Sequence, residues 1–204
     1  MIQLDLTKQI KTYDGSLLRI NTRFASCRIT QITGPSGAGK TTLLKMLAGL
    51  IRPDQGRIQV GDQVWLDTGA AICLEPQKRG VGFVFQDYAL FPHMTVEKHL
   101  LYGTRDELYI QQLLQTGRLE PFRRHKPRHL SGGQQQRLAI LRALATRPKL
   151  LLMDEPFTAL DNALKGELIA DLKQLLTAMQ TTCLVVTHQP FANGEFADDT
   201  FEMG

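Results

Sequence analysis

The chain has 204 residues, of which 43% are hydrophobic and 22% are charged, and its net charge at neutral pH is +4. These proportions are ordinary for a globular domain and exclude an extended disordered chain. No apolar run approaches the roughly 20 residues that a membrane-spanning helix needs, and the first residues lack a secretion signal, so we expect any membrane role to involve a partner. The cysteines Cys27, Cys73 and Cys183 lie far apart, which favours neither a disulfide framework nor a zinc site.

Apolar and polar residues alternate through the N-terminal third of the chain. The alternation includes Ile2, Leu4 and Leu6, then Leu18 and Ile20, and later Ile58, Val60 and Val64. Side chains on a strand point to opposite faces in turn, so this period of two predicts a strand-rich, antiparallel part with one buried face.

A glycine-rich loop follows the predicted strand 28–33. It fits the pattern G-x-x-x-x-G-K-[ST] and precedes a predicted helix that begins near residue 39. Glycines allow a tight curl whose backbone N–H groups point at phosphate oxygens, and the positive helix end faces the same anion. We therefore predict a nucleotide-phosphate site in which Lys40 reaches the β- and γ-phosphates and the Thr41 hydroxyl binds Mg²⁺. The loop consists of Gly34, Pro35, Ser36, Gly37, Ala38, Gly39, Lys40, Thr41 and Thr42.

Two further candidates lie on either side of this loop in the sequence. Tyr13 follows the first predicted strand, where its ring either stacks on a nucleotide base or packs against a strand end. Residues 81–86 are apolar or small up to Gln86, which is typical of a buried strand that delivers a polar side chain to its tip. A glutamine at that place is also a common turn residue, so the assignment of Gln86 to the site depends on the motifs that follow.

Residues 87–145 have a different character, with short amphipathic runs at Val96–Leu101 and Leu108–Leu114 that predict an inserted helical part. The sequence Leu130-Ser131-Gly132-Gly133-Gln134 precedes a longer helix, for which Ser131 is a suitable N-cap. Its exposed N–H groups form a second anion-binding helix end. One nucleotide rarely needs two such ends, unless the second serves a nucleotide held by another subunit.

Two more buried strands are predicted near the C-terminus. Leu150–Met153 is apolar and ends in Asp154 and Glu155, which indicates a parallel strand with charge at its ligand-binding edge. Asp154 is a candidate Mg²⁺ ligand, and Glu155 a candidate base for the water that attacks the γ-phosphate. Thr182–Thr187 ends at His188, for which we favour a γ-phosphate contact over a structural role. The spacing of leucines over residues 162–179 predicts a core helix between the two strands.

Taken together, these motifs resemble the ATP-binding subunit of ABC transporters, over nearly the whole chain. The resemblance rests on residues 34–42, Gln86, Leu130–Gln134, Leu150–Glu155, Ala159–Asp161 and His188. It implies an α/β P-loop NTPase fold in one domain: a RecA-like core of about 1–86 and 146–204, an N-terminal antiparallel part, and a helical subdomain of about 87–145. It also implies an ATPase whose cofactors are ATP and Mg²⁺.

The family resemblance also implies roles for single residues. Lys40, Gln86, Glu155 and His188 take part in hydrolysis, and Thr41, Gln86 and Asp154 hold Mg²⁺. The expected homodimer encloses ATP between the loop of one copy and Ser131, Gly132, Gly133, Gln134 and Asp161 of the other. Residues 87–92 are expected to contact a transmembrane permease subunit, at the cytoplasmic face of the cell membrane. No nucleic-acid partner is expected.

Residues 72–93 are most similar to molybdate- and sulfate-type importers, although importers of iron, polyamines or sugars share parts of this stretch. An ABC ATPase for export or lipoprotein release is one alternative. A soluble ABC protein of translation or DNA repair is another, but such proteins usually carry two ATPase units or a long insertion. Relatives often continue into a C-terminal regulatory domain, and we expect none within these 204 residues.

Overall fold

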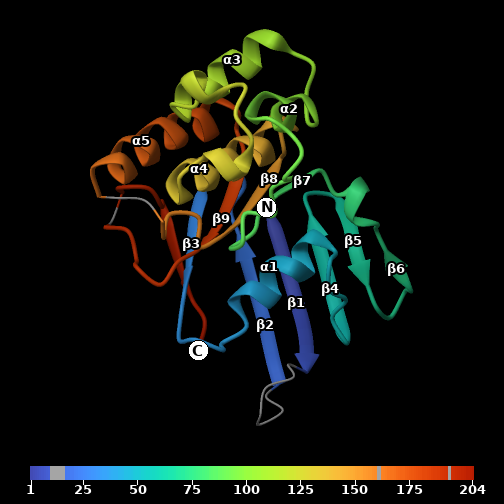
Figure 1. Ribbon diagram of the computed structural model, residues 1–204. Coiled ribbons are helices and arrows are strands. Elements are labelled where there is room, and N and C mark those ends of the chain that lie inside the picture. Colours follow the sequence, from blue (N-terminus) through green and yellow to red (C-terminus); the bar gives the residue numbers. More distant parts are fainter. Residues whose placement is uncertain (10–16, 160–161, 193) are drawn as a thin grey trace.

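The computed structural model describes residues 1–9, 17–159, 162–192 and 194–204 (Figure 1). The strands are β1 (Ile2–Gln9), β2 (Leu17–Phe24), β3 (Ile29–Thr33), β4 (Gln55–Val60), β5 (Gln63–Asp67), β6 (Ile72–Cys73), β7 (Val81–Val84), β8 (Leu150–Asp154), β9 (Thr182–Val186) and β10 (Asp199–Glu202). The helices are α1 (Lys40–Ala48), α2 (Val96–Leu101), α3 (Glu107–Thr116), α4 (Gly132–Ala145) and α5 (Asn162–Ala178).

A parallel sheet forms the centre of the fold. Its strand order is β10-β3-β9-β8-β7, and each neighbouring pair runs parallel. Strands β8 and β9 are buried along their whole length, as expected for strands covered on both faces. The α/β fold predicted from the sequence is confirmed. Strand β10 was not predicted, because its four residues, Asp199–Glu202, carry little apolar pattern.

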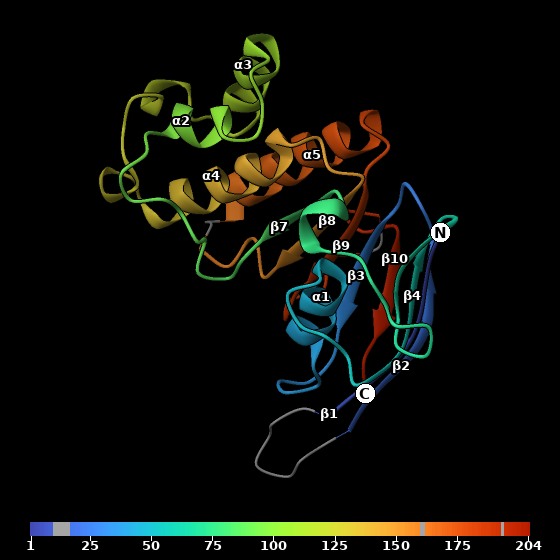
Figure 2. The ribbon, with the colours of Figure 1, turned by 90° about the vertical axis from the view of Figure 1, so that its right-hand side faces the viewer.

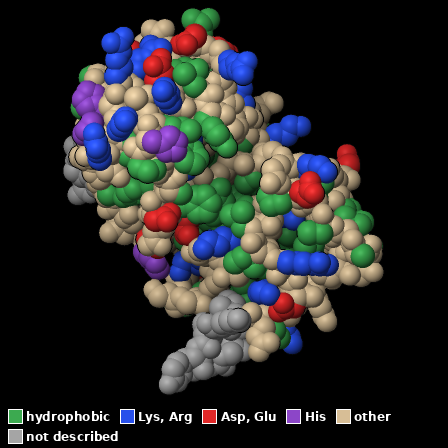
Figure 3. Space-filling view, turned by 45° about the vertical axis from the view of Figure 1, so that its right-hand side comes forward, with side chains coloured by type: hydrophobic (Ala, Val, Ile, Leu, Met, Phe, Trp, Pro, Cys, Tyr) green, Lys and Arg blue, Asp and Glu red, His purple; other side chains and the backbone are tan. Residues whose placement is uncertain are grey.

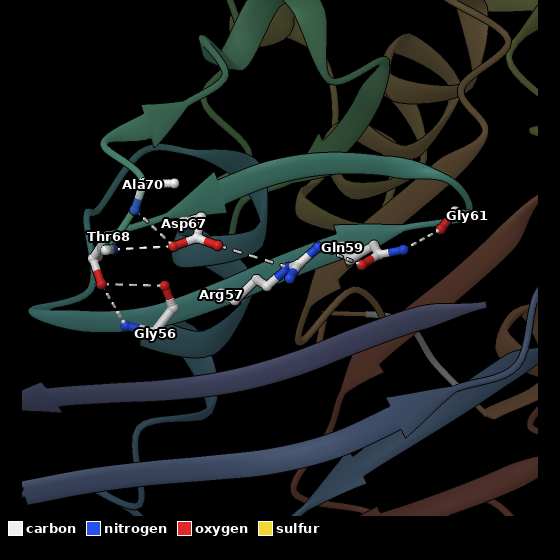
Figure 4. A network of polar contacts seen from close by, with 8 residues as sticks. Gly56, Arg57, Gln59, Gly61, Asp67, Thr68 and Ala70 are labelled. Atoms are coloured by element: carbon white, nitrogen blue, oxygen red, sulfur yellow. Dashed lines mark hydrogen bonds and ion pairs between the residues drawn. The ribbon is translucent and has the colours of Figure 1, made fainter.

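The N-terminal part forms a second, antiparallel sheet in the order β2-β1-β4-β5-β6, as the alternating pattern predicted. Polar contacts run along β4 and join its start to the end of β5 (Figure 4). The Arg57 guanidinium donates to Gln59 Oε1 at 3.0 Å, and Gln59 Nε2 donates to the Gly61 carbonyl at 3.1 Å. At the other end, the Gly56 N–H donates to Thr68 Oγ1 at 2.9 Å.

The central sheet has a different layer on each face. Leu150 and Leu152 of β8 pack in one apolar cluster with α1 and the antiparallel sheet. Leu151 and Met153, which point the other way, pack in a second cluster with α4 and α5. Figures 1 and 2 show this arrangement, with α4 and α5 on one side of the parallel sheet and α1 on the other. Because the side chains of β8 point alternately to the two faces, the parallel sheet is the middle one of three layers.

Helices α2, α3 and α4 lie between β7 and β8 in the chain and form the helical end of the molecule (Figure 2). Their apolar side chains belong to the same buried cluster as those of α5 and the parallel sheet. Tyr109 of α3, for example, donates from its hydroxyl to the Leu144 carbonyl of α4 at 2.9 Å. The helical part is therefore joined to the core by continuous packing, and its division as a subdomain of about 87–145 stays a prediction.

Candidate functional site

The candidate residues gather at the carboxyl edge of the parallel sheet. Gly34 follows β3, Gln86 follows β7, Asp154 ends β8 and His188 follows β9. Strand β8 lies between β7 and β9, and Asp154 is in register with Val186. Ligands bind at this edge in open α/β sheets. The topology thus brings together motifs that are up to 154 residues apart in the sequence.

The loop before α1 has the backbone that its glycines were expected to provide. Gly34, Gly37 and Gly39 have φ values of 142°, 85° and 90°, where other residues are strained. A side chain at Gly34 would also collide with the Met203 carbonyl beyond β10. Helix α1 begins at Lys40, directly after the loop, so its N-terminal N–H groups face the loop interior.

The Lys40 side chain is buried, with 6% of its surface exposed, and curls back over the loop. Its ammonium group donates to the Gly34 carbonyl at 2.7 Å and to the Pro35 carbonyl at 2.8 Å. An ammonium within the nest of loop N–H groups places both kinds of phosphate-binding donor in one small volume.

A hydroxyl and a carboxylate meet beside the loop. The Thr41 hydroxyl donates to Asp154 Oδ1 at 3.1 Å. Burial raises the pKa of Asp154, the charge of Glu155 raises it further, and the Thr41 hydrogen bond opposes both. These are hard oxygen donors, which suit Mg²⁺ in combination with phosphate oxygens. In the described part of the chain, no three His, Cys, Asp or Glu side chains lie close enough together to hold a metal ion by themselves.

Glu155 and His188 form the second polar pair. His188 Nε2 lies 2.9 Å from Glu155 Oε1, and both residues line a cavity of about 240 Å³. The backbone of Glu155 has a φ of 50°, an unfavourable value for a residue with a side chain. Its N–H donates to the Val186 carbonyl at 3.0 Å, which ties this strained residue to β9. A carboxylate and an imidazole are thus fixed together at the sheet edge.

Helix α4 begins with a complete capping box. The Gln134 N–H donates to Ser131 Oγ at 3.3 Å, and the Ser131 N–H donates to Gln134 Oε1 at 2.8 Å. Ser131 was predicted as the N-cap, and this prediction is confirmed. These contacts satisfy two of the free N–H groups at the helix end.

The profile described as "ABC transporter" matches residues 17–158, which is more than half of the chain. The chain belongs to this ABC transporter family. The Molybdenum import ATP-binding protein ModC of Haemophilus ducreyi is 42% identical over 191 residues, covering 92% of this chain and 53% of that protein. The chain thus spans about half the length of this ModC.

Other members of the family are similar to this chain over most of its length. The probable sulfate/thiosulfate import ATP-binding protein CysA of Chlorella vulgaris is 43% identical, covering 90% of this chain and 78% of that protein. A solved dimer of MJ0796, a bacterial ABC transporter cassette, has a TM-score of 0.80 and 32% identity, covering 100% of this chain and 94% of that one. The ABC cassette fold expected from the sequence is therefore confirmed.

Gln136 is a buried residue of this ABC cassette that the sequence motifs did not single out. Its side chain is fully buried and bridges α4 to the backbone after β8. Nε2 donates to the Glu155 carbonyl and to Thr158 Oγ1, both at 3.4 Å, and Oε1 accepts from the Ala159 N–H at 3.2 Å. The available signal was a glutamine at helical spacing from Ile140 and Ala143, on a face that is otherwise apolar.

Three predicted residues stand apart from these contacts. Tyr13 and Asp161 lie outside the described residues. Gln86 is exposed and follows β7, the strand next to β8, so the topology places it near Asp154. The roles assigned to single residues of the site stay predictions.

Proposed function

We propose that this chain binds and hydrolyses ATP as the motor subunit of an ABC importer. The observation that carries the proposal is the Glu155–His188 pair, at 2.9 Å, beside the Thr41–Asp154 pair and the glycine loop. A base for water, a magnesium-ligating pair and a phosphate nest at one sheet edge are the parts that phosphoryl transfer to water requires. A solved relative in a "post-hydrolysis state" bound to ADP and Pi has a TM-score of 0.77 and 32% identity.

Each residue has a role in this proposal. The N–H groups of residues 34–42 bind the phosphates, and Lys40 moves from the loop carbonyls to their oxygens. Thr41, Asp154 and Gln86 would hold Mg²⁺, which neutralises phosphate charge when bound. Glu155 takes the proton of the attacking water, and His188 orients that water or the γ-phosphate. The contact between His188 and Glu155 keeps both side chains at the point of attack.

The proposed active form is a homodimer. Ser131–Gln134 form a helix end at the surface, and their capping box leaves the remaining helix N–H groups free for an anion. Two copies that each cover the other's nucleotide would use both anion sites of the chain. Both solved cassettes named above are dimers, which supports this arrangement.

The proposed partner is a transmembrane permease, which would hold the chain at the cytoplasmic face of the membrane. In the described part of the chain, no helix has the length and apolar character that crossing a bilayer requires. Tyr88 and Leu90 are partly buried against the core, and Tyr102, whose ring centre is 5.5 Å from that of Phe91, is 70% exposed. Figure 3 shows hydrophobic side chains gathered across the middle of one face. We assign residues 87–92 to the permease contact.

For the transported substrate we propose a tetrahedral or similarly small oxyanion, of the molybdate or sulfate type. Relatives named for molybdenum and sulfate import support this choice. Relatives named for spermidine/putrescine and Fe(3+) import are 42% and 41% identical. Specificity belongs to the permease and its solute-binding protein, so purifying the chain with both of them and testing these solutes in proteoliposomes decides the substrate.

The decisive test of the ATPase mechanism is Glu155→Gln. The amide keeps the shape of the carboxylate but cannot accept the proton, so ATP turnover should fall by roughly 10²–10⁴ while ATP binding persists. ATP should then hold two copies together, as measured by light scattering at saturating ATP and Mg²⁺. Adding Ser131→Arg should restore the monomer, because a bulky cation would fill the second anion site. Unchanged turnover in Glu155→Gln would refute the assignment of the base.

The light-scattering measurement of the dimer needs one control. If Glu155→Gln stays monomeric alone, the measurement is repeated with the copurified permease, which holds two copies close together. Failure in both settings contradicts the shared-nucleotide dimer. A permease that exports, or a soluble complex without a permease, would instead favour the alternative functions.

A further inference from the structure

The segment Tyr88–Phe91 has an unusual backbone. Tyr88 and Ala89 are consecutive non-glycine residues in the left-handed region, with φ values of 63° and 45°. This conformation costs on the order of 1–2 kcal/mol per residue, so the surrounding structure must hold it. Within the segment, the Tyr88 N–H donates to the Phe85 carbonyl and the Ala89 N–H to the Asp87 carbonyl, at 3.0 and 2.7 Å. These short turns leave the carbonyls of Tyr88 and Ala89 free to accept other donors.

Arg142 of α4 supplies those donors. Its Nη2 donates to the Tyr88 carbonyl at 3.1 Å and its Nη1 donates to the Ala89 carbonyl. The same guanidinium lies 5.4 Å from the centre of the Phe91 ring, within cation–π range. One planar group therefore contacts three of the four residues of segment 88–91. Lysine cannot reproduce this contact, because it lacks the fixed fork of donors.

His99 of α2 holds the other end of the segment. The side chain is fully buried, and its ring is stacked on Phe91 with centroids 5.8 Å apart. Nδ1 lies 2.7 Å from the Thr95 carbonyl, which can only accept, so Nδ1 carries the hydrogen. Nε2 is then an acceptor, and it receives the Phe91 N–H at 3.0 Å. This arrangement requires the neutral imidazole.

We propose that Arg142 and His99 are positioning residues, which hold segment 88–91 in the conformation that the permease recognises. This inference rests on the proposed function, which assigns the permease contact to residues 87–92. Arg142 contacts the segment from α4, and His99 contacts it from α2, the helix that follows the segment. Neither touches the phosphate loop or the Glu155–His188 pair through the contacts described above.

The first test measures hydrogen exchange of the isolated chain, so it does not depend on the permease. In His99→Phe, the Phe91 amide loses its acceptor and should exchange at least about tenfold faster than in the wild type. His99→Gln offers an amide oxygen in place of Nε2 and should restore part of the protection. In Arg142→Gln, the carbonyls of Tyr88 and Ala89 lose their donor, which should loosen the two short turns. The amides of Tyr88 and Ala89 should therefore exchange faster by a similar factor. If Arg142→Gln does not fold, Arg142→Lys replaces it.

Arg147→Gln is the matched control. Arg147 also lies over an aromatic ring, that of Tyr109 at 4.2 Å, and pairs with a carboxylate, that of Asp106 at 2.8 Å. Its loss should leave exchange in segment 88–91 unchanged. Unchanged exchange in the folded Arg142 and His99 variants would overturn the inference, whatever the permease does.

The second test measures ATP turnover with and without the copurified permease. Basal turnover and the KM for ATP should stay at wild-type values in the Arg142 and His99 variants. Stimulation by the permease should fall by about two- to thirtyfold, the range of typical coupling effects. Faster exchange together with full stimulation would overturn the positioning role. If the wild type itself is not stimulated by any permease, the proposed function fails, and the exchange data still report what holds the segment.

Discussion

Replacing Gln136 tests whether helix α4 helps to hold Glu155, the proposed catalytic base. Gln136→Leu keeps the approximate volume of the side chain but removes its hydrogen bonds to Glu155 O, Thr158 Oγ1 and Ala159 N. Each typical bond contributes about 0.5–1.5 kcal/mol, and two of these three are long, so we expect a loss of about 1–3 kcal/mol in stability. The same bonds restrain Glu155 at its φ of 50°.

The effect on catalysis should exceed the effect on binding. If Glu155 relaxes from its strained backbone, its carboxylate moves away from the point of attack, and kcat should fall about tenfold or more. The KM for ATP should change little, because the phosphate loop is not touched. Tyr109→Phe is the control, since it removes a buried hydrogen bond to the far end of the same helix, at Leu144. Equal losses of kcat in both variants would show that only helix stability matters and would refute the reasoning.

Further predictions concern the charged and titratable groups of the site and the segment beside it. Lys40→Ala should weaken ATP binding by at least about tenfold in titrations with a fluorescent ATP analogue, because it removes the only ammonium within the loop. Asp154→Asn should raise the midpoint of thermal unfolding in the absence of nucleotide. Burial raises the pKa of this carboxyl, so its negative charge destabilises the fold at neutral pH. The same substitution should abolish ATP turnover. Burial lowers the pKa of His99 below 6.5, so the unfolded chain takes up the proton first and stability should fall as the pH drops below about 6.5. Urea unfolding at pH 7.5 and 5.5 should show a smaller pH difference in His99→Gln.

Much of the fold was predictable because its elements have strong local patterns. The strands β8 and β9 are apolar runs that end in polar residues, and α1 starts where the glycine loop ends. Helix α2 has the predicted bounds, Val96–Leu101. Strand β10 escaped prediction because its backbone hydrogen bonds to β3, rather than an apolar pattern, determine its place. Such pairing between residues 169 apart has no local signal.

The candidate site was likewise predictable only in part. The places of Lys40, Thr41, Asp154 and His188 at this sheet edge could be predicted because each lies at or near the end of a recognisable loop or strand. The pairing of His188 with Glu155 depends on the register of β8 and β9, which the sequence does not specify.

Arg142 and Gln136 were missed for a different reason. Both lie inside a helix whose pattern is explained by core packing, and their partners are backbone atoms of distant segments. A backbone carbonyl has no residue type, so no motif can indicate it.

Helix α4 connects the parts of the molecule that a transport cycle would have to coordinate. Its 14 residues span about 21 Å, and it begins at the Ser131 end assigned to the partner's nucleotide. One turn later Gln136 contacts the Glu155 backbone, and less than two turns after that Arg142 contacts segment 88–91. A helix of this length is stiff, so it moves as one body unless its side-chain contacts break. A shift of segment 88–91 that carries Arg142 along would therefore also displace Gln136 relative to Glu155, which would give the proposed permease a direct physical route to the proposed base.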